Sequence, residues 1–519
     1  EQSQYPIYNL TTPLNHFPTS PEYPATNQTF PLRYIIDTSH YQPGGPVFVI
    51  AGGETSALNR IPFLSQGIVH ELARIYQGVA LIAEHRYYGT SYPSQQPEGK
   101  IPLSSLKYLT TEQAVEDYAY LATHLPPILA TLLPTTNNHT NTNTTLAPSL
   151  SPRDTPWIIY GGSYAGFHAA LTRRTHPKTY HAAISSSGVT AAIIDYWQYY
   201  EAIRLHAPKA CVETQQTLIE FTDRVLRYPA PEYRAQLKGI FGGRAPGLDD
   251  QAFVAELTAP LGLFQDRNWD PRVGGWGFAW YCGNLTSPII VDEGVEGEVG
   301  GVVRGLVQGF GHDEGRKEEL VRAVVNWVAF IRRMGVFEDD AKDEIDIEGQ
   351  DKLLPRSAST SWNYQVCTEW GYFTPGATVP AHIRPLVSRL LTLEYWVDMC
   401  NATYGITDPP DVDRINRHGG FAFSYPRVAH IGGLADPWRE ATPFATGLPP
   451  RNATAEEPML LMEVSADEVY DGMEGAVHHW DQNGVFGVDE GKRVVPPRGV
   501  REAQGEIVGF VGGWLGEWR

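Results

Sequence analysis

The pentapeptide GSYAG at residues 162–166 is the feature that most limits how this chain can fold. A continuous apolar run at 157–160 precedes it, and helix-forming residues follow at 167–174. In that context the G-x-S-x-G pattern places a serine on a tight turn between a strand and a helix, above the edge of a sheet. Glycines flank the serine because a Cβ would clash where the two backbones approach each other. The pattern therefore predicts that Ser163 is a nucleophile; the alternative is an ordinary glycine-rich turn.

Other short apolar runs indicate the sheet to which this turn belongs. They lie at residues 46–51, 79–83, 182–185, 427–433 and 459–464. In the first part of the chain helix-like segments separate them, such as residues 111–118, where Thr110 or Thr111 can cap the N-terminus. Strands that alternate with helices over short links favour a mostly parallel sheet covered on both faces.

The stretch between about residues 190 and 400 lacks this alternation of strands and helices. Residues 318–334 carry apolar side chains at helical spacing, with Asp313 as a cap at the start and Gly335 at the end. The acidic stretch 338–351 reads as a solvated loop. We predict an α/β-hydrolase fold with a largely helical cap inserted into it. The expected divisions are residues 1–190 (first part of the hydrolase domain), 191–405 (cap) and 406–519 (second part).

A serine hydroxyl needs a base to activate it and an acid to orient that base, and in this fold the order along the chain is Ser, Asp, His. Asp436 follows the strand-like run at 427–433, and its alternative role is a turn or capping residue. His478 and His479 follow the run at 459–464. Position and order favour one of the two histidines as the base but do not choose between them.

Stabilising the oxyanion of an acyl transfer requires two N–H donors. We expect one from Tyr164, the residue after the nucleophile, and one from Gly53 in the loop that follows the run at 46–51. The alternative for Gly53 is a simple tight turn. The two adjacent histidines lack an accompanying His-x-x-Glu pattern, so we expect neither a catalytic metal nor another cofactor.

Charge and hydropathy restrict the partners. The net charge of −19 argues against nucleic acid or an anionic membrane as a partner. No apolar run of about 18 residues is found, so we expect no membrane span. The first residues lack the basic and apolar segments of a signal peptide and are interpreted as a processed end.

Seven glycosylation sequons and four cysteines favour the secretory route, with the lysosome or vacuole as the alternative destination. The sequon asparagines are Asn9, Asn27, Asn138, Asn143, Asn284, Asn401 and Asn452. Two of them fall in a Thr/Asn/Ser/Pro-rich stretch at 135–151 that reads as an exposed loop. Cys211, Cys282, Cys367 and Cys400 suit two disulfides, whose pairing the sequence does not give. Monomer and homodimer both stay open.

Several motifs in order along the chain resemble one peptidase family. They are EHRYYG at 84–89, GGSYAG at 161–166, QVCTE at 365–369, DPW at 436–438 and HHWD at 478–481. The chain is similar, from about residue 30 to 485, to the proline-specific serine peptidases of family S28. These include lysosomal Pro-X carboxypeptidase, dipeptidyl peptidase II and fungal prolyl endopeptidases.

The resemblance implies an α/β-hydrolase domain with a helical cap and cleavage on the carboxyl side of proline. It maps the family's triad to Ser163, Asp436 and His478, the first histidine of the pair. The family usually writes Gly-Ala-His-His, whereas this chain inserts Val477, and the basic residue often found after the pair is missing. His479 therefore stays an alternative base.

A proline ring needs a compact apolar slot, and rigid aromatic side chains suit its walls. Trp438 and Phe167 are candidate walls, although both also suit core packing. Glu369, Trp370 and Tyr372 of the cap are candidates for lining the site from above. Carboxypeptidase, dipeptidyl peptidase and endopeptidase action all stay open, as does the pH optimum. An esterase or lipase and a catalytically silent binding module are the rival functions.

Overall fold

The structure is a computed structural model that describes residues 5–93, 99–133, 149–271, 273–311, 313–338, 346–348, 351–484 and 495–518. The predicted loop at 135–151 lies almost entirely outside the described residues, together with Asn138 and Asn143. The acidic stretch 338–351 also lies mostly outside them. Its described part contains a short strand rather than loop alone.

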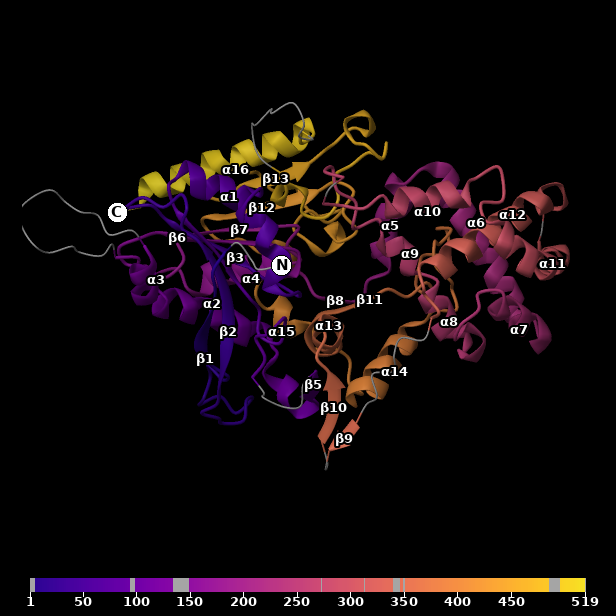
Figure 1. The fold of residues 1–519 in the computed structure, drawn as a ribbon, viewed down its shortest axis with the longest axis horizontal. Coiled ribbons are helices and arrows are strands. Elements are labelled where there is room, and N and C mark those ends of the chain that lie inside the picture. Colours follow the sequence, from indigo (N-terminus) through magenta and orange to yellow (C-terminus); the bar gives the residue numbers. More distant parts are fainter. Residues whose placement is uncertain are drawn as a thin grey trace, which may run out of the picture.

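An eight-stranded sheet forms the centre of the molecule (Figure 1). In spatial order its strands are β1 (Ile7–Pro13), β2 (Thr29–Asp37), β4 (Val79–Ala83), β3 (Val47–Ala51), β6 (Trp157–Gly162), β7 (Ala182–Ser186), β12 (Val428–Gly433) and β13 (Met459–Met462). The pairings β1–β2 and β2–β4 are antiparallel, and the remaining pairings are parallel. The fold is that of an α/β hydrolase, as the sequence predicts.

The five predicted runs are confirmed as strands β3, β4, β7, β12 and β13, and the run before Ser163 is β6. Strands β3, β4, β6, β7 and β12 are buried along their whole length, which accounts for their continuous apolar sequences. The sequence analysis did not assign β1 and β2. Strand β1 faces solvent at alternate positions and is rich in polar residues, so its apolar signal is weak.

Helices cover both faces of the sheet. They are α1 (Ile68–Ile75), α2 (Thr111–His124), α3 (Pro126–Leu132), α4 (Tyr164–Thr175) and α16 (Arg498–Glu517). Helices α1 and α16 pack with Phe48, Ile50 and Ile82 on one face. Helices α2 and α4 pack on the other face, and Thr110 caps α2 as predicted. These helices cover the faces of the sheet, so the carboxyl ends of the parallel strands, where such folds bind ligands, lie together at one edge.

A group of helices lies beside the sheet, on the right in Figure 1. It comprises α5 (Glu201–His206), α6 (Lys209–Arg227), α7 (Pro231–Gly239), α8 (Asp250–Glu256), α9 (Ala259–Gly262), α10 (Gly277–Leu285), α11 (Glu293–Phe310) and α12 (Lys317–Arg333). The disulfide Cys211–Cys282 joins α6 to α10. The predicted helix 318–334 is α12, but Asp313 caps the short 3₁₀ turn before it rather than α12 itself.

The later part of the insertion packs close to the hydrolase domain. Its elements are β9 (Asp346–Glu348), β10 (Asp351–Pro355), α13 (Ala358–Gln365), β11 (Gly371–Phe373) and α14 (Leu393–Tyr404). Strand β11 pairs with β8 (Ile193–Asp195) from the start of the insertion, and α15 (Asp413–Asn416) follows the insertion. Strand β10 pairs with β5 (Lys100–Pro102), and Cys367–Cys400 joins the turn after α13 to α14. The insertion is therefore not helical throughout, and the domain boundaries near residues 190 and 405 remain a proposal.

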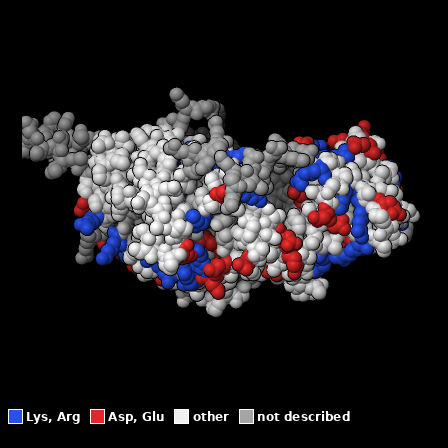
Figure 2. Space-filling model, turned by 90° about the horizontal axis from the view of Figure 1, so that it is seen from below, with Lys and Arg blue, Asp and Glu red and all other residues white. Residues whose placement is uncertain are grey.

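The surface carries charges of both signs. Figure 2 shows acidic and basic side chains interspersed over the cap end of the molecule on the face drawn there. Among the described residues, no helix has the length and apolarity that crossing a membrane would need.

Candidate active site

Ser163 occupies the turn between β6 and α4 with φ 61° and ψ −133°. A non-glycine residue in such a region stores about 1–3 kcal/mol of strain and is held there by its surroundings. The flanking glycines explain how the backbone can adopt this conformation. A Cβ on Gly161 would lie 2.0 Å from the Ala165 carbonyl oxygen, and one on Gly166 would lie 2.7 Å from the Cα of Gly188. The local sequence thus permits the sharp turn that presents a serine at the carboxyl edge of the sheet.

The two predicted oxyanion donors lie on adjoining segments. Tyr164 is the first residue of α4, where N–H groups have no partner within the helix. Gly53 has φ +69°, and a Cβ there would lie 3.2 Å from the Cβ of Ala165. The loop after β3 therefore lies against the first turn of α4, as a shared oxyanion site requires.

His478 contacts Asp436 through one ring nitrogen. Its Nδ1 lies 3.0 Å from each carboxylate oxygen of Asp436. A carboxylate only accepts, so Nδ1 carries the hydrogen and Nε2 keeps its lone pair. That Nε2 is buried and has no hydrogen-bond partner among the described residues. Asp436 also accepts the backbone N–H of Trp438 at 2.9 Å, which fixes the carboxylate.

His479 is placed differently from its neighbour. Its backbone N–H donates to Ser187 Oγ at 2.9 Å, and its Cδ2 lies 3.4 Å from where a Cβ on Gly162 would be. The ring therefore rests on the nucleophile turn, 4.6 Å from the His478 ring between centroids. Burial, and then the nearby His478, hold the pKa of His479 well below its usual value, so this ring is neutral. Of the pair, His478 is the one that contacts Asp436.

Asp481 contacts the two strands next to the nucleophile turn, and the sequence analysis gave it no role. It is fully buried and accepts hydrogen bonds from Tyr160 at 2.8 Å and from Ser186. The backbone oxygen of Ser186 in turn accepts the N–H of Ser163 at 2.8 Å. Asp481 therefore connects the histidine loop to the strands on either side of the nucleophile. In the sequence, the position of Asp481 in the HHWD motif was the feature that could have pointed to it.

Trp438 joins the site to the cap. Its ring stacks on Tyr196 with centroids 5.5 Å apart, and it meets Tyr199 and Tyr372 edge to face at 5.4 and 4.9 Å. Its indole N–H donates to Gln265 Oε1 at 2.6 Å. The ring centroid lies 6.5 Å from that of His478. No motif in the sequence pointed to Gln265, which comes from the loop after α9.

The other predicted substrate-binding residues, Phe167, Glu369 and Trp370, are buried in the structure, and their contact with substrate stays a prediction. Phe167 and Trp370 have no exposed surface and pack edge to face, with centroids 5.5 Å apart. Glu369 is 1% exposed, accepts from the N–H and hydroxyl of Thr111 at 3.1 Å, and pairs with Arg414 at 3.1 Å. Core packing of Phe167 and Trp370 and the pairing of Glu369 are each a structural role that these side chains have in this structure.

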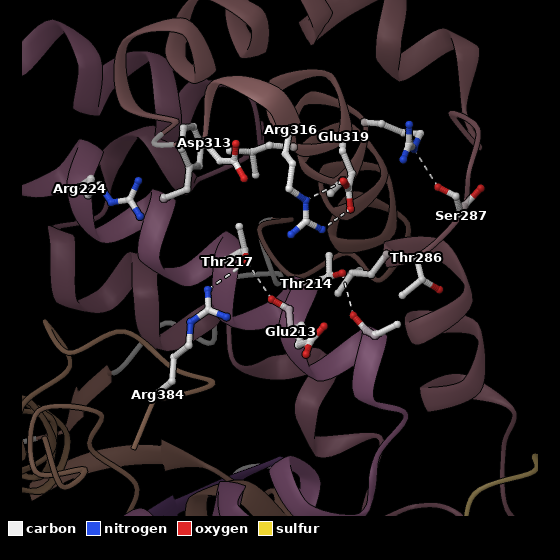
Figure 3. Close-up of a pocket in the computed structure, with 16 residues that line it drawn as sticks. Glu213, Thr214, Thr217, Arg224, Thr286, Ser287, Asp313, Arg316, Glu319 and Arg384 are labelled. Atoms are coloured by element: carbon white, nitrogen blue, oxygen red, sulfur yellow. Dashed lines mark hydrogen bonds and ion pairs between the residues drawn. The ribbon is translucent and has the colours of Figure 1, made fainter. Parts of the chain in front are cut away.

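A separate cavity of about 500 Å³ lies within the cap between α6, α10 and α12 (Figure 3). Arginines line it, but Arg316 pairs with Glu319 at 2.7 Å and Arg384 pairs with Glu220 at 2.6 Å. These charges are already neutralised. None of the predicted catalytic residues lines this cavity.

Comparison with known proteins decides the family. The family described as serine carboxypeptidase S28 matches residues 13–131 and 140–224. A probable extracellular serine carboxypeptidase of Arthroderma benhamiae is 36% identical to this chain, over 98% of it and 68% of the relative. The chain belongs to the serine carboxypeptidase S28 family. Membership makes it a serine peptidase, and the resemblance drawn from its motifs is confirmed.

Less similar relatives also match along most of their length. The serine protease vicPb of Bipolaris victoriae is 24% identical over 84% of this chain and 79% of its own. The thymus-specific serine protease of Mus musculus is 25% identical over 81% of this chain and 76% of its own. The similarity therefore spans both the hydrolase domain and the insertion.

Proposed function

We propose that this S28 peptidase hydrolyses peptide bonds on the carboxyl side of proline, with Ser163 as nucleophile, His478 as base and Asp436 as the acid that orients it. The observation that carries the proposal is the His478 ring. Its Nδ1 is bound to Asp436, and its Nε2 is buried without a partner among the described residues, in a loop that rests on the nucleophile turn.

The reaction is acyl transfer. His478 Nε2 takes the proton of Ser163 Oγ as that oxygen attacks the carbonyl carbon, and Asp436 stabilises the imidazolium that forms. His478 then returns the proton to the leaving amine, and water repeats the sequence to release the acid. The N–H groups of Tyr164 and Gly53 stabilise the oxyanion, and loss of one such donor costs about 3 kcal/mol of barrier.

The proline preference rests on the aromatic side chains beside His478. Trp438, Tyr196, Tyr199 and Tyr372 form a rigid apolar cluster, and Trp438 is partly exposed. Such walls suit a pyrrolidine ring, which is compact and apolar and, within a peptide, has no N–H to satisfy. The name of the Arthroderma relative supports release of a C-terminal residue as the mode of action.

Secretion is part of the proposal. Both disulfides fit an oxidising compartment, and the Arthroderma relative is named as extracellular. The sequon residues Asn9, Asn27, Asn401 and Asn452 are exposed and open to a glycan. Asn284 is half-buried, and its amide donates to the Trp280 carbonyl at 2.7 Å, so it is the least suited of the described sequons.

The test compares wild type with Ser163→Ala, His478→Ala and His479→Ala on three chromogenic peptides. One is a blocked peptide ending in Pro-Phe, one a free-amine X-Pro reporter, and one a blocked peptide with a reporter after proline. We expect cleavage after proline that falls on the order of 10⁶-fold in Ser163→Ala and His478→Ala. His479→Ala, the matched control, retains measurable hydrolysis.

Three other outcomes would change the proposed function or the assignment of the base. Hydrolysis of simple esters alone would replace the peptidase specificity with that of an esterase. A larger loss in His479→Ala than in His478→Ala would reassign the base. Silence of the wild type on every substrate would favour a binding module.

A further inference from the structure

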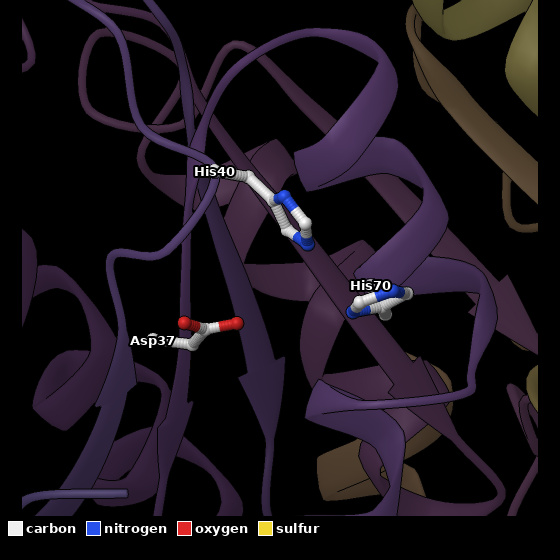
Figure 4. A group of neighbouring side chains, drawn as sticks. All are labelled: Asp37, His40 and His70. Carbon is white, nitrogen blue, oxygen red and sulfur yellow. The ribbon is translucent and has the colours of Figure 1, made fainter.

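A cluster of two histidines and one aspartate lies away from the catalytic residues (Figure 4). Asp37 is the last residue of β2, His40 follows in the next turn, and His70 lies in the first turn of α1. One ligand atom from each of the three lies within 4.8 Å of the other two. Figure 4 shows the carboxylate and the two rings turned toward a common space. The active-site chemistry uses none of these residues.

The cluster is on the opposite edge of the sheet from Ser163. Asp37 pairs with Ala80, near the start of β4, because β2 runs antiparallel to it. Ser163 follows the last residue of β6, which is parallel to β4 through β3. A ligand bound at the cluster therefore cannot touch a substrate at Ser163.

We propose that Asp37, His40 and His70 form a zinc-binding site that clips the end of β2 to helix α1. Two imidazole nitrogens and one carboxylate oxygen are ligands that Zn²⁺ takes, with water as the fourth. Tetrahedral bonds of about 2.0–2.1 Å place ligand atoms roughly 3.4 Å apart. The three atoms must therefore close in by about an ångström, which rotation of two half-buried histidine side chains allows.

Hydrogen bonds outside the cluster already hold two of the ligands in the required form. His70 Nδ1 lies 2.8 Å from the Leu64 carbonyl oxygen, which only accepts, so the hydrogen is on Nδ1 and the Nε2 lone pair is free. This is the arrangement in which a metal-bound histidine is usually held. Asp37 Oδ1 accepts the Ser39 N–H at 2.9 Å, which fixes the carboxylate.

The surrounding charge also suits a cation. Asp37 is 7% exposed and brings a negative charge. Arg74, one turn from His70, is paired with Glu71 at 2.7 Å, so its positive charge is offset. The two rings already meet edge to face with centroids 4.9 Å apart, so little ordering is needed on binding.

The test measures Zn²⁺ bound to chelator-treated, untagged full-length protein by equilibrium dialysis at micromolar Zn²⁺. We expect one Zn²⁺ per chain in the wild type, and affinity at least about tenfold weaker in His40→Ala and in Asp37→Asn. His382→Ala removes an exposed histidine elsewhere and His478→Ala disrupts the active-site pair. Both should bind as the wild type does.

Two further readouts separate loss of the site from loss of the fold. His40→Ala should keep wild-type peptide hydrolysis, and Zn²⁺ should raise the thermal midpoint of the wild type but not of this variant. If His40→Ala does not fold, Asp37→Asn and His70→Gln replace it. Absence of bound Zn²⁺ in the wild type, retention of full affinity in the cluster variants, or loss in His478→Ala alone would overturn the proposal.

Discussion

Replacement of Asp481 by asparagine should remove a pH dependence of stability that arises inside the catalytic domain. Asp481 is fully buried, and its oxygens accept from the hydroxyls of Tyr160 and Ser186. Burial raises the pKa of this carboxyl from 3.8 to about 6 against the opposing effect of the hydrogen bonds. The folded protein thus holds this proton more tightly than the unfolded chain does.

The sign and size follow from linkage. Stability from this group is fully present below about pH 4 and is lost as the pH rises to about 6, because the folded state binds more protons over that interval. One pKa unit corresponds to about 1.4 kcal/mol, so the full change is about 3 kcal/mol. Asparagine is neutral throughout, and its amide can donate to one hydroxyl and accept from the other. The stability of the variant therefore lacks the pH dependence that Asp481 contributes.

The assay is urea unfolding followed by tryptophan fluorescence, for wild type and Asp481→Asn, at intervals from about pH 3 to about pH 7. We expect the free energy of unfolding of the wild type to fall by about 3 kcal/mol relative to the variant across this range. Asp467→Asn, at an exposed carboxyl, is the matched control and should show no such divergence. A wild-type-minus-variant difference that is constant with pH would refute the reasoning.

Three further predictions concern the nucleophile turn and the contacts of the insertion. Gly166→Ala introduces a Cβ 2.7 Å from a neighbouring backbone atom and should lower the free energy of unfolding by about 1–3 kcal/mol in chemical denaturation. Arg414→Ala removes the cation that pairs with Glu369 and Glu112. Burial already raises the pKa of Glu369 to about 8, so this carboxyl can become neutral, and the variant should cost about 1–3 kcal/mol, whereas Arg417→Ala, whose side chain is 57% exposed, should cost less than about 1. Equal costs for the two arginines would contradict the buried-pair argument. Gln265→Leu removes the acceptor for two partly buried donors, the Tyr199 hydroxyl and the Trp438 indole N–H, and should lower kcat/KM for a Pro-Phe peptide by about tenfold or more; unchanged values would count against the role of that contact.

The centre of the sheet could be predicted because burial on both faces leaves a continuous apolar signal. Strands β3, β4, β6 and β7 carry it, while β1 carries polar residues on its solvent side and was missed. The triad candidates came from motif order. Position and order along the chain do not separate two adjacent histidines. The resemblance favours the first, and in the structure His478 is the one that contacts Asp436.

Substrate contacts are the part of the prediction that sequence supports least. Phe167 is one turn beyond Ser163, and from sequence the core-facing and site-facing sides of that helix look alike. The structure buries it against Trp370. Gln265 could not be found from sequence, because its importance arises from the fold of the insertion bringing it to Trp438.

The contact between Gln265 and Trp438 has a consequence for engineering. Trp438 also donates its backbone N–H to Asp436, so one residue touches both the insertion and the carboxylate that contacts His478. Exchange of the insertion between relatives, a natural route to altered specificity, would therefore disturb turnover as well as recognition. A transplanted insertion needs its own acceptor for the Trp438 indole, and chimeras that supply one should retain the most activity.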